Sequence, residues 1–166
     1  MKKFALALLL LLAPMVANAT TVSVIPPDTT VALNSEFTLT VATDGLPDLL
    51  AFQFIYHYDP TLLEFLGAEP GNLLTDPYVF WAYPCGPDSI WYDAANLGHS
   101  VSGPGVLVYL HFRTIGMGQS WITCPYVDFR DSHNNKTFPT CGSARVMNDA
   151  LPTWNSTWGR VKVLWR

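Results

Sequence analysis

The stretch from Ala51 to Tyr58 constrains the fold most, because its side chains alternate strictly in kind. It reads Ala-Phe-Gln-Phe-Ile-Tyr-His-Tyr, so that every second residue is aromatic. Successive side chains of an extended chain point to opposite sides, and this alternation therefore predicts a strand with one buried face. Asp59-Pro60 ends the strand, since proline has no N–H for the ladder. We expect the core to receive Phe52, Phe54, Tyr56 and Tyr58, and the outer face to carry Ala51, Gln53, Ile55 and His57.

Short apolar or alternating segments, separated by turns rich in proline, glycine and asparagine, recur along the chain. With the first strand they predict nine strands, at residues 22–25, 31–41, 51–58, 62–66, 89–95, 106–113, 119–123, 126–129 and 159–164. Residues 78–87 have no clear period and are expected to form an irregular strand or a loop. Helical spacing is scarce, so the pattern predicts an all-β, two-sheet sandwich.

The strand at 106–113 has its own alternation. One side holds Val106, Val108, Leu110 and Phe112, and the other holds Leu107, Tyr109, His111 and Arg113. We expect the first set to be buried and the second to point outward.

The N-terminus has the three regions of a secretory signal peptide. Met1-Lys-Lys is basic, residues 4–12 are apolar, and Ala17-Asn-Ala19 supplies the small residues of a cleavage site. A membrane helix is the alternative, but the apolar run is short and Pro14 lies directly after it. We expect cleavage after Ala19, an exported domain at residues 20–166, and no membrane span in the mature chain.

Composition excludes some partners. The formal net charge is −4 with only nine Lys and Arg residues, which leaves no basic surface for nucleic acid. Charged residues make up 13% and hydrophobic residues 49% of the chain, so a packed domain is expected rather than a disordered one.

Three cysteines in an exported chain predict one disulfide and one remaining thiol. Cys124 and Cys141 flank a turn near residues 134–135, so a hairpin would bring them together, and this pairing is preferred. Pairing of Cys85 with Cys141 and three free thiols are the alternatives.

Two stretches resemble cohesin domains, the receptor modules of cellulosome scaffolds. Tyr58-Asp-Pro, then Leu63-Glu64, Gly67 and Pro70-Gly71 resemble the third-strand region, and residues 103–112 followed by Gly118 resemble a later turn, strand and glycine turn. A short closing strand at residues 161–164 also agrees. The resemblance implies a non-catalytic jelly-roll sandwich that holds a helical dockerin on one sheet face, with polar contacts from its third strand.

Carried onto this sequence, the resemblance implies a partner-binding surface. It comprises Ala51, Gln53, Ile55 and His57, extended by Leu107, Tyr109 and His111. Cellulosomal cohesins of the best-known type carry Asn and Asp where this chain has Ala51 and Gln53. The departure predicts a different partner specificity, or none.

A carbohydrate-binding module is the alternative function, because the chain has six tryptophans and seven tyrosines. Flat aromatic faces stack on pyranose rings, and the candidate platforms are Trp81 with Tyr83 and Trp154 with Trp158. Packing of these rings between the sheets is the favoured interpretation. A strip of coplanar aromatics would favour sugar binding, and a flat, mildly apolar face would favour protein docking.

Neither an enzyme nor a metal site is expected. Asp131-Ser132-His133 has triad residue types, but neighbours on a turn do not form a relay. Asp59, which could pair with Glu64 as a catalytic carboxylate, fits a turn better. The four histidines are scattered, and no cofactor is expected. Calcium ligands could come from Asp128, Asp131, Asn134 and Asn135, although a plain turn is favoured.

Overall fold

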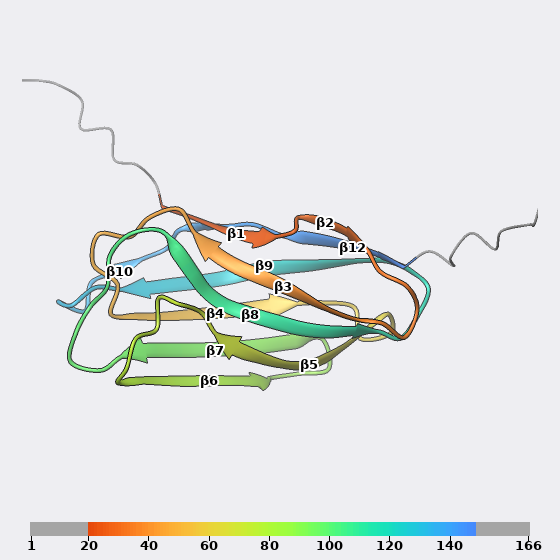
Figure 1. Cartoon of the computed structure of the whole chain (residues 1–166), viewed down its shortest axis with the longest axis horizontal. Helices are drawn as coiled ribbons and strands as arrows, with labels where there is room; N and C mark the ends of the chain where they lie inside the picture. The colour runs from red at the N-terminus through yellow and green to blue at the C-terminus, as the bar shows by residue number, and fades with distance from the viewer. Residues whose placement is uncertain (1–19, 149–166) are drawn as a thin grey trace, which may run out of the picture.

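The computed structural model describes residues 20–148, which form two stacked β-sheets (Figure 1). The expected signal peptide, the closing strand at 159–164, Trp154 and Trp158 lie outside these residues. Within the described part of the chain, no helix is long and apolar enough to cross a membrane. The predicted all-β sandwich is confirmed.

The sheets have five and seven strands. The first, in the order β11-β1-β3-β8-β5, contains β1 (Thr21–Ile25), β3 (Glu36–Thr43), β5 (Leu63–Pro70), β8 (Gly105–Thr114) and β11 (Thr140–Cys141). The second, in the order β2-β12-β9-β4-β7-β6 with β10 beside β9, contains β2 (Asp28–Thr30), β4 (Ala51–His57), β6 (Tyr78–Pro84), β7 (Ser89–Asn96), β9 (Gly118–Arg130), β10 (Lys136–Thr137) and β12 (Ala144–Asn148).

Residues 20–148 thus hold twelve strands, which differ from the expected set. The strand expected at 31–41 begins only at Glu36, because a turn occupies the residues before it. The segments predicted at 119–123 and 126–129 are one strand, β9. Residues 78–84 form a regular strand, although their sequence has no clear period. The strands β2, β10, β11 and β12 were not predicted. Three of them are only two or three residues long, and β2 pairs with β12, and β11 with β1, across most of the described chain.

The core lies between the sheets and is rich in aromatic side chains. Phe52, Phe54 and Tyr56 of β4 are at most 2% exposed, as the alternation predicts. Phe54 packs edge-on against Phe129 of β9, with ring centroids 5.8 Å apart. Phe112 of β8 is fully buried in the facing sheet. Each such ring contributes about 1.5–3 kcal/mol through burial, so these residues hold the sheets face to face.

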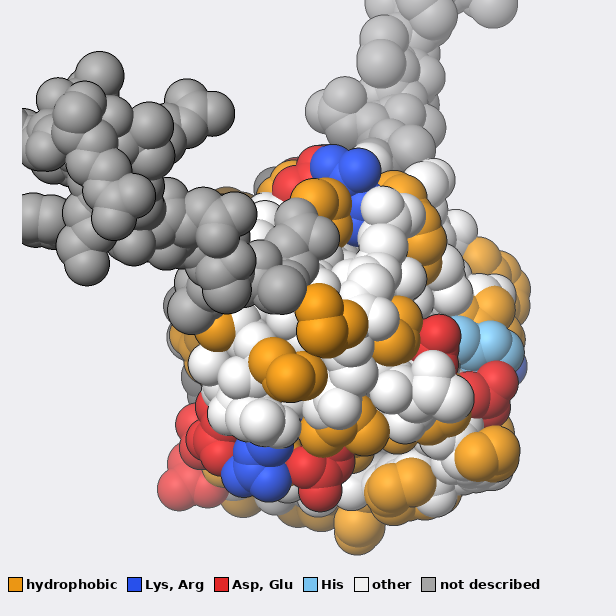
Figure 2. Space-filling model, turned by 90° about the vertical axis from the view of Figure 1, so that its right-hand side faces the viewer, with side chains coloured by type: hydrophobic (Ala, Val, Ile, Leu, Met, Phe, Trp, Pro, Cys, Tyr) orange, Lys and Arg blue, Asp and Glu red, His pale blue; other side chains and the backbone are white. Residues whose placement is uncertain are grey.

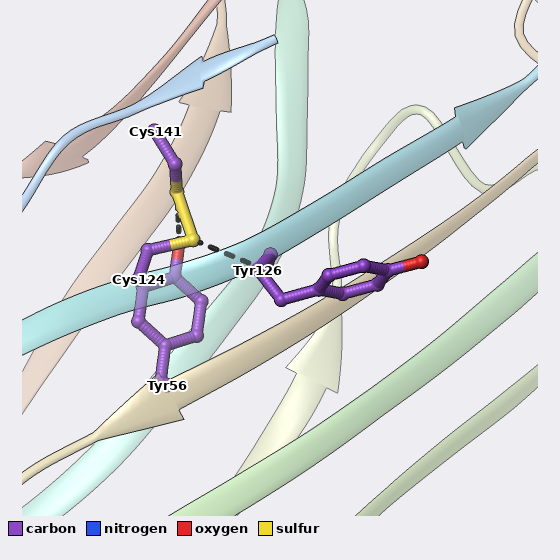
Figure 3. Close-up of a disulfide and its surroundings, with 4 residues drawn as sticks. All are labelled: Tyr56, Cys124, Tyr126 and Cys141. Carbon is purple, nitrogen blue, oxygen red and sulfur yellow. Dashed lines mark hydrogen bonds between the residues drawn. A yellow bond between two sulfur atoms is a disulfide. The ribbon is translucent and has the colours of Figure 1, made fainter. Parts of the chain in front are cut away.

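A disulfide between Cys124 and Cys141 connects the two sheets (Figure 3). Cys124 belongs to β9 and Cys141 to β11, with Cα atoms 5.9 Å apart. The preferred pairing is therefore present, but the link crosses the sandwich rather than a hairpin of one sheet. The Tyr56 hydroxyl donates a hydrogen bond to Cys141 Sγ at 3.5 Å, because a disulfide sulfur carries no hydrogen. Burial raises the pKa of this hydroxyl, which keeps it protonated.

The end of the sandwich where β3 and β9 begin is shown in Figure 2. Its loops expose Leu33, Ile115 and Met117 by 42%, 44% and 56%. The hydrophobic side chains visible in this view are separated by polar atoms. Scattered apolar side chains are normal on protein surfaces, so this end is not the candidate site.

Candidate functional site

The outer face of β4 carries the first four residues of the expected partner-binding surface. Ala51, Gln53 and Ile55 are half-buried and His57 is exposed. β4 lies between β9 and β7, so these side chains occupy the middle of the seven-stranded sheet. The predicted orientation of this strand is confirmed.

The other three residues of that surface do not join it. β8 pairs with β3 and β5 in the five-stranded sheet, so Tyr109 and His111 lie on the opposite side of the sandwich from β4. The sequence resemblance places β8 correctly as a strand, but the sheet to which a strand belongs depends on long-range pairing. The expectation of one continuous surface is wrong.

The alternation also predicts the wrong orientation for Leu107. It was expected to point outward, but it is fully buried. Along β3, Val41 pairs with Val108 and Ala42 pairs with Val106, which leaves Leu107 as an extra residue on β8. Such a bulge reverses the alternation beyond it. Leu107 therefore points into the core, and a contact role for it at the surface is wrong.

Two aromatic candidates from β6 do share the face of β4. Trp81 is 57% exposed and Tyr83 is 45% exposed, so packing between the sheets, the favoured interpretation, is wrong for both. Tyr83 stacks against Trp91 of β7, with ring centroids 6.4 Å apart and planes 7° apart. The alternation from Ser89 to Ala95 could have identified Trp91 as an outward residue. It could not have identified which residues of other strands lie beside Trp91.

A hydrogen-bond network fixes polar side chains in this face. The carboxylate of Asp93 accepts one bond from Gln53 Nε2 at 2.8 Å and another from Trp91 Nε1 at 2.7 Å. All three outward side chains come from β4 and β7, which are neighbouring strands. Sequence reasoning missed Asp93, because its importance depends on this pairing.

A second polar group lies on β9. Asp128 is only 2% exposed and receives Lys136 Nζ at 2.9 Å and the Tyr126 hydroxyl at 3.2 Å through Oδ2. Its Oδ1 has no hydrogen-bond partner within residues 20–148. Arg130 Nη2 lies 3.8 Å from the same carboxylate. Asp128 is thus a buried carboxylate that lies beside two cations, Lys136 and Arg130, on the β9 side of this sheet face.

The family model described as Cohesin domain matches residues 22–120, which is more than half of the chain. The chain belongs to the cohesin domain family. The expected cohesin resemblance and jelly-roll fold are therefore confirmed. Among curated proteins, none matches this sequence.

Solved cohesins have the same fold as this cohesin domain. The sixth cohesin of scaffoldin B from Acetivibrio cellulolyticus, in complex with a mutant dockerin, is 17% identical with a TM-score of 0.70, covering 79% of this chain and 99% of that one. A non-cellulosomal cohesin from Archaeoglobus fulgidus is 18% identical with a TM-score of 0.68, covering 81% and 94%. A cohesin module of a Clostridium perfringens family 33 glycoside hydrolase is 13% identical with a TM-score of 0.65, covering 80% and 96%.

The opposite face of this cohesin domain is different in character. It carries the threonines of β3, and Arg113 of β8 is paired with Glu36 and Glu64. His111 Nδ1 lies 2.9 Å from the Thr38 hydroxyl. Glu69 lies 3.8 Å from His111 Nε2. Among the described residues of this face large exposed aromatic side chains are lacking, although Leu66 and Ile25 are exposed.

The residues considered for calcium do not converge on one point. Asp131 accepts bonds from Asn135 and from the backbone N–H of His133, and Asn134 accepts one from Arg130. These bonds lower the pKa of Asp131, with the Asn135 side chain as the main cause. Asp128 is occupied elsewhere, by Lys136. Residues 131–135 form a hydrogen-bonded turn, which is the interpretation favoured from the sequence.

Asp48 joins Asp131 and His133 in a group whose ligand atoms lie within 4.8 Å of one another. The Ser132 hydroxyl donates its single hydrogen to Asp48 at 2.6 Å, so it does not also donate to His133 Nδ1, which lies 3.3 Å from the same oxygen. Hydrogen bonds from Ser100 and Ser132 lower the pKa of Asp48. The group is therefore a set of hydrogen bonds that joins the loop before β4 to the turn after β9, at one end of the seven-stranded sheet.

Asp59, which together with Glu64 was the candidate pair of catalytic carboxylates, closes a turn. Its Oδ1 accepts bonds from the backbone N–H and the hydroxyl of Thr61, at 2.9 and 2.6 Å. These bonds lower the pKa of Asp59, and its side chain is committed to the corner after β4.

Proposed function

We propose that this cohesin domain is an exported, non-catalytic receptor that docks a dockerin-like helical module on the outer face of β9, β4, β7 and β6. Such docking would attach a partner to an extracellular polysaccharide-degrading or surface assembly. Membership of the cohesin family supports this function, as do solved relatives in complex with dockerins. Export would follow from the signal peptide expected at residues 1–19.

The observation that carries the proposal is the difference between the two outer faces. The face of β4 combines half-buried Ile55 and Trp91 with exposed Tyr83, and these residues occupy one row across three strands. The opposite face presents threonines and charged side chains around half-buried Tyr109, and its exposed apolar side chains, Leu66 and Ile25, lie apart on β5 and β1. Interfaces draw most of their affinity from a central group of apolar and aromatic residues, which only the first face offers within the described residues.

The polar groups of the face suit a role in register and specificity. Gln53 is tied to Asp93, so its amide is held in place before a partner arrives. Fixed polar groups reduce the entropy lost on association and reject partners that leave them unpaired. Since Ala51 and Gln53 replace the Asn and Asp of well-known cohesins, we expect a dockerin of different sequence preference.

The test is binding of the chain lacking residues 1–19 to a panel of purified dockerins by isothermal titration calorimetry. Ile55→Asp should weaken binding of the cognate dockerin about thirtyfold or more, because a charge at the centre of an interface costs about 2 kcal/mol. Thr40→Asp, on the outer face of β3, is the matched control and should leave affinity unchanged.

Circular dichroism of both variants checks that the fold is retained. Equal affinity of folded Ile55→Asp and the unsubstituted chain would place docking elsewhere. Loss of binding in Thr40→Asp instead would assign it to the five-stranded sheet.

A further inference from the structure

The outer face of the seven-stranded sheet is hollowed between Trp81 and Arg130. The hollow has a volume of about 210 Å³. Strand register places its outward residues in two rows across β6, β7, β4 and β9, namely Val79, Ala95, Ala51 and Arg130 in one and Trp81, Asp93, Gln53 and Asp128 in the other. The two alanines leave the space open, because they are the smallest side chains of their row.

An aromatic surface forms one side of the hollow. Trp81 lines it and is 57% exposed, although a tryptophan gains substantial free energy from burial. In the next row, Tyr83 and Trp91 continue the aromatic surface with nearly parallel rings. The exposed indole of Trp81 offers a flat π face to the C–H groups of a ligand ring, which is the arrangement that favours stacking of sugars.

The polar lining is balanced in charge. The lining holds two carboxylates, Asp93 and Asp128, and one cation, Arg130; Lys136 lies outside the lining but neutralises Asp128 through an ion pair at 2.9 Å. An anionic or cationic ligand therefore gains no net attraction, whereas a neutral ligand can use donors and acceptors together. Hydroxyl groups do both, since each donates one hydrogen bond and accepts others.

The polar groups are also fixed in advance. Asp93 is held by Gln53 and Trp91, and Asp128 is held by Lys136. Asp128 Oδ1 is buried without a partner among the described residues, so a ligand hydroxyl at the base of the hollow would supply the missing donor. Small-molecule sites typically combine an apolar lining with a few fixed polar groups of this kind.

From these features we propose that the hollow binds one neutral pyranose unit of a polysaccharide, stacked on Trp81 and hydrogen-bonded by Gln53, Asp93, Asp128 and Arg130. The hollow is smaller than the roughly 300–1,000 Å³ of drug-sized sites, so it accommodates one ring. The remainder of the saccharide chain would extend over Tyr83 and Trp91. Sugar binding does not rest on the docking function, but both ligands would cover Tyr83 and Trp91, so sugar and dockerin should compete for this sheet face.

The test is titration of the chain lacking residues 1–19 with cellohexaose, xylohexaose and mannohexaose. Binding is monitored by tryptophan fluorescence and by NMR chemical shifts. At least one should bind with a dissociation constant of about 1 mM or below, as expected for one stacked ring with few hydrogen bonds. Oligogalacturonate, an anionic probe, should bind more weakly. No binding of any neutral probe at about 10 mM, or stronger binding of oligogalacturonate, would overturn the proposal.

Two variants distinguish sugar binding in the hollow from non-specific binding to exposed aromatic side chains. Trp81→Ala removes the stacking surface, and Ala95→Leu fills the hollow while every aromatic ring stays. Each should weaken binding about tenfold or more. Trp121→Ala is the matched control, because Trp121 is 50% exposed on β9 beside Arg145, seven residues from Asp128.

Equal loss in Trp121→Ala, or full binding by folded Ala95→Leu, would refute a site in the hollow. Dockerin titrations of the same variants are recorded separately. A chain that binds sugar but no dockerin contradicts only the proposed docking function, and the reverse result contradicts only the sugar site.

Discussion

Replacement of Leu107 by alanine distinguishes the observed sheet register from the one that simple alternation predicts. Leu107 is fully buried because the bulge opposite Val41 and Ala42 turns it into the core. Truncation of a buried leucine removes transfer free energy and leaves a cavity, and it costs about 3 kcal/mol. An outward leucine would cost about 0.5 kcal/mol or less.

The expected loss is large enough to measure in two ways. With a urea dependence of about 2 kcal/mol per molar, the midpoint of unfolding should fall by about 1.5 M. A domain of the length of residues 20–166 loses about 0.3 kcal/mol per degree near its melting temperature, so Tm should fall by about 10 °C. The urea dependence itself should not change, because the substitution alters stability and not the surface exposed on unfolding.

Tyr109→Ala is the matched control, since Tyr109 lies two residues along β8 and points outward. Its cost should be about 1 kcal/mol or less, from cross-strand contacts alone. If Leu107→Ala and Tyr109→Ala destabilise the domain equally, or if Leu107→Ala costs under about 1 kcal/mol, the bulge and the resulting orientation are wrong.

Three further measurements test features of the fold. Replacing Cys124 and Cys141 by serine opens a loop with a sequence separation of 17 and should lower the free energy of unfolding by about 3 kcal/mol, with the reduced unsubstituted chain showing the same loss. Gly71→Ala places a Cβ atom against the backbone of β8 and should cost about 2 kcal/mol or more in urea unfolding. Asp59 has a pKa lowered by Thr61, so its contribution to stability is present above about pH 3.8 and is lost as the pH falls through the folded value. The fall in stability on acidification should therefore be smaller in Asp59→Asn, measured by urea unfolding between pH 5 and 2; an identical fall would show that this hydrogen bond contributes nothing.

The placement of the candidate sugar site follows from the residues that differ from well-known cohesins. Ala51 is one of the two alanines that open the hollow, and Gln53 holds Asp93 beside it. The resemblance to cohesins predicts a polar residue at this position, and the alanine found there leaves space for a ligand. Variants on different strands test the two functions: Ile55→Asp on β4 tests docking, and Trp81→Ala on β6 and Ala95→Leu on β7 test sugar binding.

The sequence alone determined the properties that depend on local order. The aromatic alternation of β4 determined which of its side chains are buried, because a period of two has only one arrangement that buries Phe52, Phe54 and Tyr56. Asp59-Pro60 determined where that strand ends, and the order of the two cohesin-like stretches indicated the family.

Only the tertiary structure decided which strands are neighbours. Alternation does not reveal that β8 lies in the other sheet, that a bulge buries Leu107, or that Trp81, Asp93 and Gln53 share one row. These facts depend on hydrogen bonds between residues far apart in the chain. The sequence of one strand does not show which other strands it will pair with. The composition of the functional face is therefore a property of the sheet and not of any single segment.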